Sequence, residues 1–232
     1  MMINTGTGQS HGLQFSSHEV VPEKRTALDL TGNSPFCLQS KMELSFEFNF
    51  RPGFETYFGY IVRIIAVPGQ TEKNRQKENI DIVYNQRLRN FNFVVDENSS
   101  NVFDIDSLSL HTKWNRIKIR FHLEKQQVAL EVNGKIAAST KMRANKNACV
   151  KLLFGINSEE GFQTVDLPPM QIRNIRVSEN NKMTHSFPLS ETQGESAKDS
   201  LGDVSGTVRN PQWIIPLHQN WKSAASIVTK GT

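Results

Sequence analysis

Residues 42–50 read Met-Glu-Leu-Ser-Phe-Glu-Phe-Asn-Phe, and this stretch decides the class of fold. Apolar and polar side chains alternate through it without a break. Successive side chains of a β-strand point to opposite faces, so all the apolar side chains share one face. A helix would instead distribute the phenylalanines around its circumference. The stretch therefore predicts a long strand that is buried on one face and wet on the other.

The same period of two recurs along the chain and predicts further strands. Asn133-Gly134 separates two of the runs, and this pair favours the tight hairpin turn whose two central residues take positive φ. After Ile172 the alternation breaks, which predicts a β-bulge near Arg173-Asn174. No stretch shows convincing helical spacing, so we predict an all-β fold, a two-sheet antiparallel jelly-roll sandwich. The polar stretches 69–79 and 190–205 are predicted to be surface loops. The residues that mark the other strands are Phe58, Tyr60, Val62 and Ile64; Phe91, Phe93 and Val95; Ile117, Ile119, Phe121 and Leu123; Val128, Leu130 and Val132; Ile136 and Ala138; Leu152 and Phe154; Met170, Ile172, Ile175 and Val177; Val204, Val208 and 213–215.

Length and composition suit one large sandwich. The chain has 232 residues, of which 37% are hydrophobic and 14 are phenylalanine, and all-β domains often run to roughly 200–250 residues. The net charge of +4 is scattered along the sequence, whereas nucleic-acid-binding proteins usually show dense basic tracts. We therefore expect no nucleic-acid partner. No apolar run approaches the roughly 20 residues that span a bilayer, so no transmembrane segment is predicted.

The two ends of the sequence differ from the middle. Residues 1–11 lack the charged and apolar regions of a signal peptide, so we predict a disordered or post-leader segment there. Without a removed leader, the same start would fit a cytosolic protein. Residues 222–232 are small and polar, like a linker to a further domain.

Cys37 and Cys149 leave two alternatives open. They could form a disulfide in an oxidising compartment, or both could be free thiols inside the fold. Each cysteine has apolar neighbours in the sequence. Free cysteines tend to be buried, so the sequence favours two buried thiols.

Two stretches resemble the central hairpin of laminin-G-like domains, which belong to the concanavalin A-like lectin/glucanase superfamily. They are 114–119, Trp-Asn-Arg-Ile-Lys-Ile, and 128–135, Val-Ala-Leu-Glu-Val-Asn-Gly-Lys. Residues 12–31, 154–177 and 185–213 are similar to the opening, penultimate and closing strands of such domains in secreted proteins of gut bacteria. The resemblance covers about residues 12–221, which we predict to be one domain. It implies a periplasmic, cell-surface or extracellular multidomain protein, in which this domain precedes a kelch-like propeller or a signalling module.

Hydrolases of that superfamily carry Glu-x-Asp-x-x-Glu on one strand, and this sequence departs from the pattern. The nearest stretch has Glu43 and Glu47 without the middle aspartate. Four strand residues separate them by about 13 Å, whereas retaining and inverting pairs need roughly 5–5.5 Å and 6.5–9.5 Å. We therefore assign both to the wet face of the strand and predict that the protein is not an enzyme, with no catalytic residues.

Asp104 and Asp106 are the better-spaced acidic pair. Two apart on a strand, their side chains would share a face at roughly 6.6 Å, which suits an inverting pair or part of a calcium shell. The same alternation with Phe103 and Ile105 also fits an exposed strand edge, which is the favoured reading. We expect no cofactor, with calcium at these two residues as the alternative.

Tyr57, Tyr60 and Tyr84 are the candidate binding residues. A sugar ring stacks on an aromatic face, and tyrosine keeps a polar hydroxyl at the wet end of its ring. Trp114 and Trp213 each begin an apolar strand, so we predict that they fill the sandwich. The alternating basic residues could attract an acidic glycan, although solvation of a wet face is the simpler reading. These residues are Arg116, Lys118, Arg120 and His122.

Three hypotheses for function follow. The first is a non-catalytic recognition module, most plausibly carbohydrate-binding, with a glycan as partner. The alternative is a structural or protein–protein interaction domain that packs on a neighbouring protein domain. The third is a diverged glycoside hydrolase, which the missing carboxylate pair makes the weakest of the three.

Overall fold

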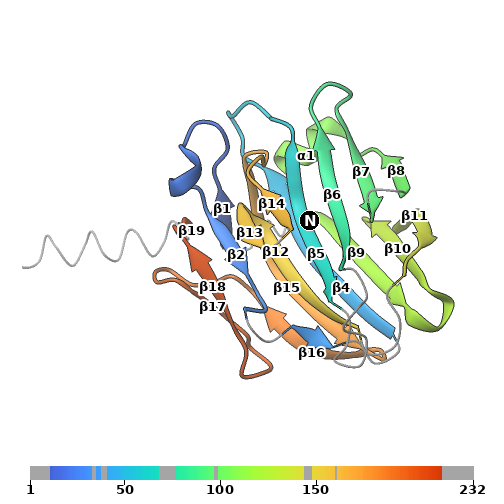
Figure 1. Cartoon of the computed structure of the whole chain (residues 1–232). Coiled ribbons are helices and arrows are strands. Elements are labelled where there is room, and N and C mark those ends of the chain that lie inside the picture. Colours follow the sequence, from blue (N-terminus) through green and yellow to red (C-terminus); the bar gives the residue numbers. More distant parts are fainter. Residues whose placement is uncertain are drawn as a thin grey trace, which may run out of the picture.

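The chain folds into two antiparallel β-sheets that pack face to face, as the computed structural model shows (Figure 1). The structure describes residues 11–32, 35–37, 41–67, 77–96, 99–143, 148–159 and 161–215. The prediction of an all-β two-sheet sandwich is confirmed. The predicted domain limits at residues 12 and 221 stay predictions, because residues 1–10 and 216–232 lie outside the described part.

Sheet A has the strand order β11-β10-β9-β4-β15-β1-β19, with β16 paired to β15. Its strands are β1 (Gly12–Phe15), β4 (Lys41–Phe50), β9 (Asn115–His122), β10 (Gln127–Val132), β11 (Lys135–Lys141), β15 (Met170–Glu179), β16 (Lys182–Phe187) and β19 (Trp213–Ile214).

Sheet B has the order β17-β18-β2-β12-β5-β6-β7-β8, with β3 paired to β12. Its strands are β2 (Ala27–Asp29), β3 (Phe36–Cys37), β5 (Gly59–Val67), β6 (Glu78–Asn85), β7 (Asn90–Val95), β8 (Ser99–Phe103), β12 (Cys149–Gly155), β17 (Ser196–Lys198) and β18 (Ser205–Arg209). A separate hairpin consists of β13 (Asn157–Glu159) and β14 (Phe162–Thr164). The short helices are η1 (Pro22–Lys24), α1 (Ser107–Thr112) and η2 (Leu123–Lys125), and no helix among the described residues has the length and apolar character needed to cross a membrane.

The core lies between the two sheets and is rich in phenylalanine. The five apolar side chains of β4, from Met42 to Phe50, all point into it and are buried, as the alternation predicts. Phe46 packs edge-on against Phe154 of sheet B with a ring-centroid distance of 5.2 Å. Phe48 packs in the same way against Phe91, with a ring-centroid distance of 5.9 Å. These edge-to-face pairs add specific packing to the burial of apolar area, so they fix how the sheets face each other.

Local backbone features follow the sequence in two places and depart from it in another. Asn133 and Gly134 both have positive φ, and the register of β15 shifts at Asn174, which confirms the predicted turn and bulge. In β5, however, a register shift between Tyr60 and Val62 turns Tyr60 away from the core. The prediction that Phe58 and Tyr60 share the buried face with Val62 is therefore wrong, because a bulge reverses the alternation.

The two predicted loops are shorter than expected. Strand β6 begins at Glu78, so the last two residues of the stretch 69–79 are buried in sheet B rather than solvated. Residues 68–76 lie outside the described part. The stretch 190–205 contains β17, which pairs with β18. Both differences arise because polar segments can also form strands, whose backbone groups pair with a neighbouring strand.

Cys37 and Cys149 form a disulfide. They lie opposite each other where β3 pairs with β12, and Cys37 is exposed while Cys149 is half-buried. The favoured expectation of two buried free thiols is wrong. Strand pairing, which the cysteine neighbours do not encode, brings the two side chains together at the surface.

Asp199 ties β16 to the segment that precedes β18. Its side chain is fully buried and accepts hydrogen bonds from the backbone N–H groups of Ser186 and Leu201, at 2.8 and 3.0 Å. The Nδ1 atom of His185 lies 2.6 Å from the other carboxylate oxygen. Burial by itself raises the pKa of Asp199, but these hydrogen bonds outweigh burial and lower its pKa below the ordinary value.

Acid should therefore weaken this junction. The stability that Asp199 contributes is present above its unfolded pKa of about 4 and is lost as pH falls through the lower folded pKa. We expect Asp199→Asn to cost about 2 kcal/mol at pH 6, because a charged acceptor is lost, and the difference from wild type to shrink towards pH 2. Urea unfolding of both proteins between pH 2 and pH 6 measures this. An unchanged difference across that range would show that the charge is not responsible.

Candidate functional site

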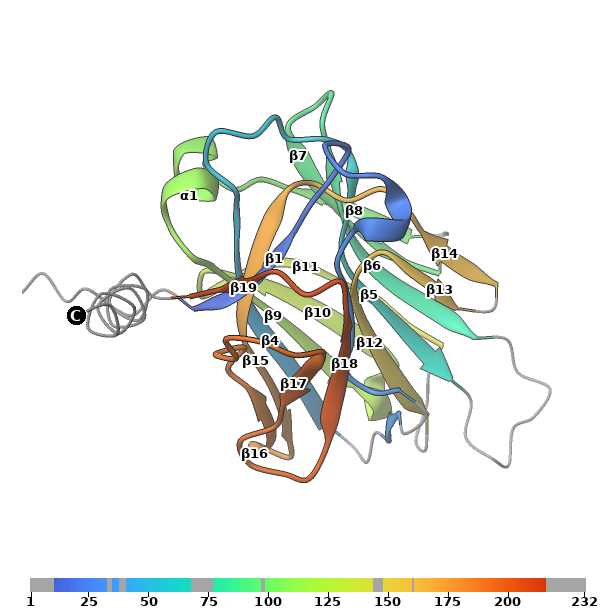
Figure 2. The ribbon, with the colours of Figure 1, turned by 90° about the vertical axis from the view of Figure 1, so that its left-hand side faces the viewer.

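One end of the sandwich carries a hollow that we call the rim site. Its volume is about 540 Å³, and its walls come from the loop 51–58, the turn between β6 and β7, and the start of α1. Figure 2 shows these segments gathered at one end of the two sheets, at the top of that view. The lining residues are Phe50, Glu55, Thr56, Tyr84, Gln86, Arg87, Arg89, Ser107, Leu110 and His111.

Tyr84 lies near the end of strand β6 and lines the rim site. Its ring is buried and meets Phe50 at 4.9 Å and Phe91 at 5.2 Å. Burial raises the pKa of its hydroxyl above the ordinary value, while a hydrogen bond with Thr56 and the charge of Arg89 partly offset this. The Tyr84 ring thus forms part of the wall of the rim site. Its hydroxyl is protonated at neutral pH and can donate or accept a hydrogen bond.

Tyr57 lies on the loop that borders the hollow. Its ring stacks on His18 with a centroid separation of 4.5 Å, and its hydroxyl donates to Glu55 at 3.1 Å. The hydrogen bond with Glu55 stabilises the protonated phenol and raises the pKa of Tyr57. Glu55 also accepts from Gln86 at 3.4 Å, so the loop and the turn are joined across the mouth of the rim site.

Two further aromatic rings lie on the same loop as Tyr57, and two cations line the hollow itself. Phe54 and Phe58 are 40% and 46% exposed, and Phe54 lies 3.8 Å beneath the guanidinium of Arg51. Arg87 and Arg89 are exposed, and no carboxylate partner for them lies within the described residues. The rim site therefore combines accessible rings with polar groups that are free to bind a ligand.

Tyr60 is not part of this cluster. It points outward from sheet B, where its ring lies 4.5 Å from the guanidinium carbon of Arg63. Arg63 in turn forms a bidentate ion pair with Asp81 at 2.7 and 2.8 Å. The structure thus brings Tyr57 and Tyr84 to one end of the sandwich and leaves Tyr60 on a different surface.

A second hollow of about 550 Å³ lies on the outer face of sheet B, beside the β13–β14 hairpin. Asp29, Thr207 and Arg209 contribute polar side chains to it, and Leu153 and Ile156 contribute apolar ones. Among its lining residues there is no aromatic ring. For ring stacking, the rim site is the better candidate of the two.

Asp104 and Asp106 do not lie on a strand, so that expectation is wrong. Strand β8 ends at Phe103, and Asp106 is the N-cap of α1, where its carboxylate accepts from the Ser109 N–H at 2.8 Å. An N-cap carboxylate satisfies a helix N–H that has no partner within the helix. Within the described ranges, no group of three His, Cys, Asp or Glu side chains could hold a metal ion. Calcium at this pair stays a prediction without a supporting contact.

Glu43 and Glu47 lie on the outer face of sheet A, as predicted for the wet side of β4. Glu47 accepts from Arg173 at 2.9 Å and from Asn174 at 3.1 Å. Burial alone raises the pKa of both carboxyls, but their hydrogen bonds and neighbouring cations lower the pKa below the usual range. A general acid at neutral pH needs a raised pKa, so both groups are poorly suited to that role.

The two tryptophans behave differently. Trp213 packs against the core and its indole N–H donates to the Gly194 carbonyl at 2.8 Å. Trp114 does not fill the sandwich, because its ring lies 4.1 Å from the guanidinium carbon of Arg173, on the outer face of sheet A. Its position just before β9 allows it to turn outward, which corrects the prediction for this residue.

Comparison with known proteins supports the fold. No known family and no curated protein matches the sequence. A proposed carbohydrate-binding protein from Bacteroides ovatus superposes with a TM-score of 0.57 at 10% identity, over 90% of this chain and 60% of that protein. The LG4-5 domains of the mouse laminin α1 chain give 0.46 at 15% identity, over 78% and 45% of the two chains. The alginate lyase AlyC3, bound to dimannuronate, gives 0.47 at 9% identity, over 73% and 89%.

The chain therefore shares a two-sheet antiparallel β-sandwich fold with the first of these proteins. It spans 60% of the length of the first of these proteins and 45% of the second. At such low identity the likeness shows the fold and nothing finer, since one fold hosts many functions. Function must be argued from the sites.

Proposed function

We propose that this chain is a non-catalytic carbohydrate-binding module that holds its ligand at the rim site. The observation that carries the proposal is a hollow lined by polar groups and the Tyr84 ring, beside a loop that holds three more rings. Those rings are Tyr57, which is half-exposed, and Phe54 and Phe58, which are exposed. Small-molecule sites are concave and combine apolar walls with a few well-placed polar groups. A sugar ring would stack on Tyr57 while its hydroxyls bond to Glu55, Gln86 and Arg87.

The proposal that the module is not an enzyme is supported by its carboxylates. Glu43 and Glu47 are held in the charged state by arginine and lysine, and Asp106 is occupied as a helix cap. Glycoside hydrolysis needs a proton-donating carboxyl facing a second one. Release of reducing ends from a polysaccharide by the pure protein would overturn this part of the proposal.

We also propose that the module works outside the cytoplasm, in the periplasm or beyond. The disulfide between Cys37 and Cys149 supports this, because disulfides persist mainly in oxidising compartments. Packing on a neighbouring protein domain stays the alternative, and self-association of this chain in a size measurement would favour such an interaction role.

Loss of the Tyr57 ring should abolish most of the binding. We expect Tyr57→Ala to weaken the affinity for a bound polysaccharide at least tenfold, because a stacked aromatic contact of about 1.5 kcal/mol disappears. Glycan-array screening would first identify a ligand, and calorimetric titration would then compare the variants.

Tyr60→Ala is the matched control. It also removes one tyrosine ring from the surface, but on the outer face of sheet B, so the affinity should stay within about twofold. Thermal melting of both variants would confirm that they remain folded. If Tyr60→Ala lost binding and Tyr57→Ala kept it, the ligand would lie on sheet B and the rim proposal would be wrong.

A further inference from the structure

The outer face of sheet A carries an excess of positive charge. We call the outward side chains of β4, β9, β10 and β15, four fully described strands, the basic face. They comprise six Lys or Arg residues and three Glu residues, an excess of three within a net charge of +4 for the whole chain. The cations are Lys41, Arg116, Lys118, Arg120, Arg173 and Arg176, and the carboxylates are Glu43, Glu47 and Glu131.

The three carboxylates are already engaged within the face. Glu43 contacts Lys118 at 3.2 Å and Arg120 at 2.8 Å, and Arg120 also contacts Glu131 at 2.8 Å. Glu47 forms ion pairs with Arg116 on β9 and with Arg173 on β15. An anion that approaches the face would therefore meet carboxylates whose charge is balanced by close neighbours.

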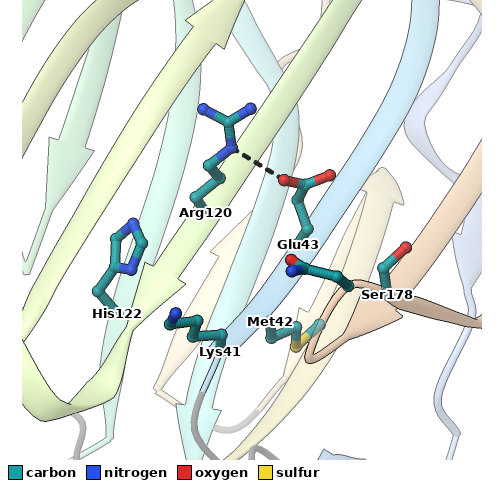
Figure 3. Close-up of a pocket in the computed structure, with 7 residues that line it drawn as sticks. Lys41, Met42, Glu43, Arg120, His122 and Ser178 are labelled. Atoms are coloured by element: carbon teal, nitrogen blue, oxygen red, sulfur yellow. Dashed lines mark hydrogen bonds and ion pairs between the residues drawn. The ribbon is translucent and has the colours of Figure 1, made fainter.

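Lys41 and Arg176 remain available. Both are exposed, and neither has a carboxylate partner among the residues that the structure describes. Lys41 lies directly opposite His122 and borders a hollow of about 490 Å³ that Ser178 and Asn181 also line. Figure 3 shows Lys41 and His122 beside the Arg120–Glu43 pair, with Ser178 across the hollow. The hollow thus offers an ammonium group, an imidazole, a hydroxyl and an amide.

The spacing of the free cations favours a polysaccharide over nucleic acid. Arg176 lies opposite Ser45, four residues along β4 from Lys41, so the two positions are about 14 Å apart. Duplex DNA presents one charge per roughly 1.7 Å of its axis and is bound through dense contacts to phosphates. The Ser178 hydroxyl lies between the two cations, opposite Glu43, whose charge is balanced by Lys118 and Arg120. This pattern suits widely spaced acidic groups separated by hydroxyls.

We propose that the basic face binds an acidic polysaccharide. One carboxylate or sulfate group lies in the hollow between Lys41 and His122, and a second, two or three sugars further on, pairs with Arg176. The inference rests on the glycan recognition proposed above, but it uses a surface separate from the rim site and names the ligand class.

The test uses the full 232-residue chain and two carboxylate- or sulfate-bearing probes, polygalacturonate and dextran sulfate. Wild-type protein should bind at least one probe, more weakly as salt increases, and should ignore fully methyl-esterified polygalacturonate. The double variant Lys41→Glu/Arg176→Glu should weaken binding at least tenfold. Lys198→Glu, a matched reversal at an exposed lysine on β17 of sheet B, should change it less than twofold.

Other outcomes overturn the inference. They are equal binding of a DNA oligonucleotide of matched charge, stronger capture by phosphatidylserine vesicles, no binding of either probe, or an unchanged affinity in the double variant. Tyr57→Ala separates the two proposals. It should leave polygalacturonate binding intact, whereas loss with Tyr57→Ala alone would place the acidic ligand at the rim site and leave only the proposed function standing.

Discussion

Reduction of the Cys37–Cys149 disulfide should lower the free energy of unfolding by about 4–5 kcal/mol. The two cysteines are 112 residues apart in the sequence, so the bond closes a very long loop. A cross-link of this length restricts the unfolded chain strongly, and the chain-entropy estimate for roughly 100 residues is about 4.7 kcal/mol. That is a large share of the 5–15 kcal/mol that typically stabilises a domain.

Urea unfolding with and without dithiothreitol measures the effect. With an m value near 3 kcal/mol/M, the midpoint should fall by about 1.5 M. The double variant Cys37→Ser/Cys149→Ser is the control, since it should match the reduced protein and not respond to dithiothreitol. Two titratable thiols in the untreated native protein, together with no effect of reductant, would contradict the prediction.

The fold could be predicted from the sequence because two of its long strands, β4 and β9, bury mainly one face. Residues 42–50 and 115–122 alternate strictly, and the structure places β4 and β9 over those stretches. The Asn133-Gly134 turn and the bulge at Asn174 were predictable for a similar reason, since each has a local sequence signal. Where a bulge has no such signal, as at Tyr60, the alternation misled the prediction.

The sites were harder to predict because they depend on which segments meet. Tyr57 and Tyr84 are 27 positions apart, and only the shared end of the sandwich brings them together. Asp106 did carry a signal, since an aspartate before Ser-Leu-Ser-Leu is a helix N-cap pattern, but the helix has only six residues and shows no periodicity. That Lys41 and Arg176 have no carboxylate partner among the described residues can be seen only once the ion pairs of the neighbouring residues are known.

Removing Asp81 should be as damaging as reducing the disulfide, with an expected cost of about 3–5 kcal/mol for Asp81→Ala. Asp81 and Arg63 lie on the outer face of sheet B but are only 2% and 5% exposed. The Arg63 guanidinium lies near the rings of Tyr60 and Phe162, at 4.5 and 5.6 Å, and Phe162 belongs to the β13–β14 hairpin that overlies this region in Figure 1. Without Asp81, a buried cation would lose its bidentate partner.

The loss of stability in Asp81→Ala should come from the unpaired charge of Arg63 rather than from loss of the ion pair itself. A buried ion pair often contributes little compared with apolar groups of similar volume, so Arg63→Met/Asp81→Leu should recover most of the stability that Asp81→Ala loses. Asn79, which donates to Asp81 at 2.7 Å, would keep one unpaired amide in both cases. Asp104→Ala, at an exposed aspartate, should cost less than about 0.5 kcal/mol and controls for loss of a carboxylate. Urea unfolding of wild type and these three variants measures each cost, and a double variant no more stable than Asp81→Ala would show that the unpaired charge is not the cause.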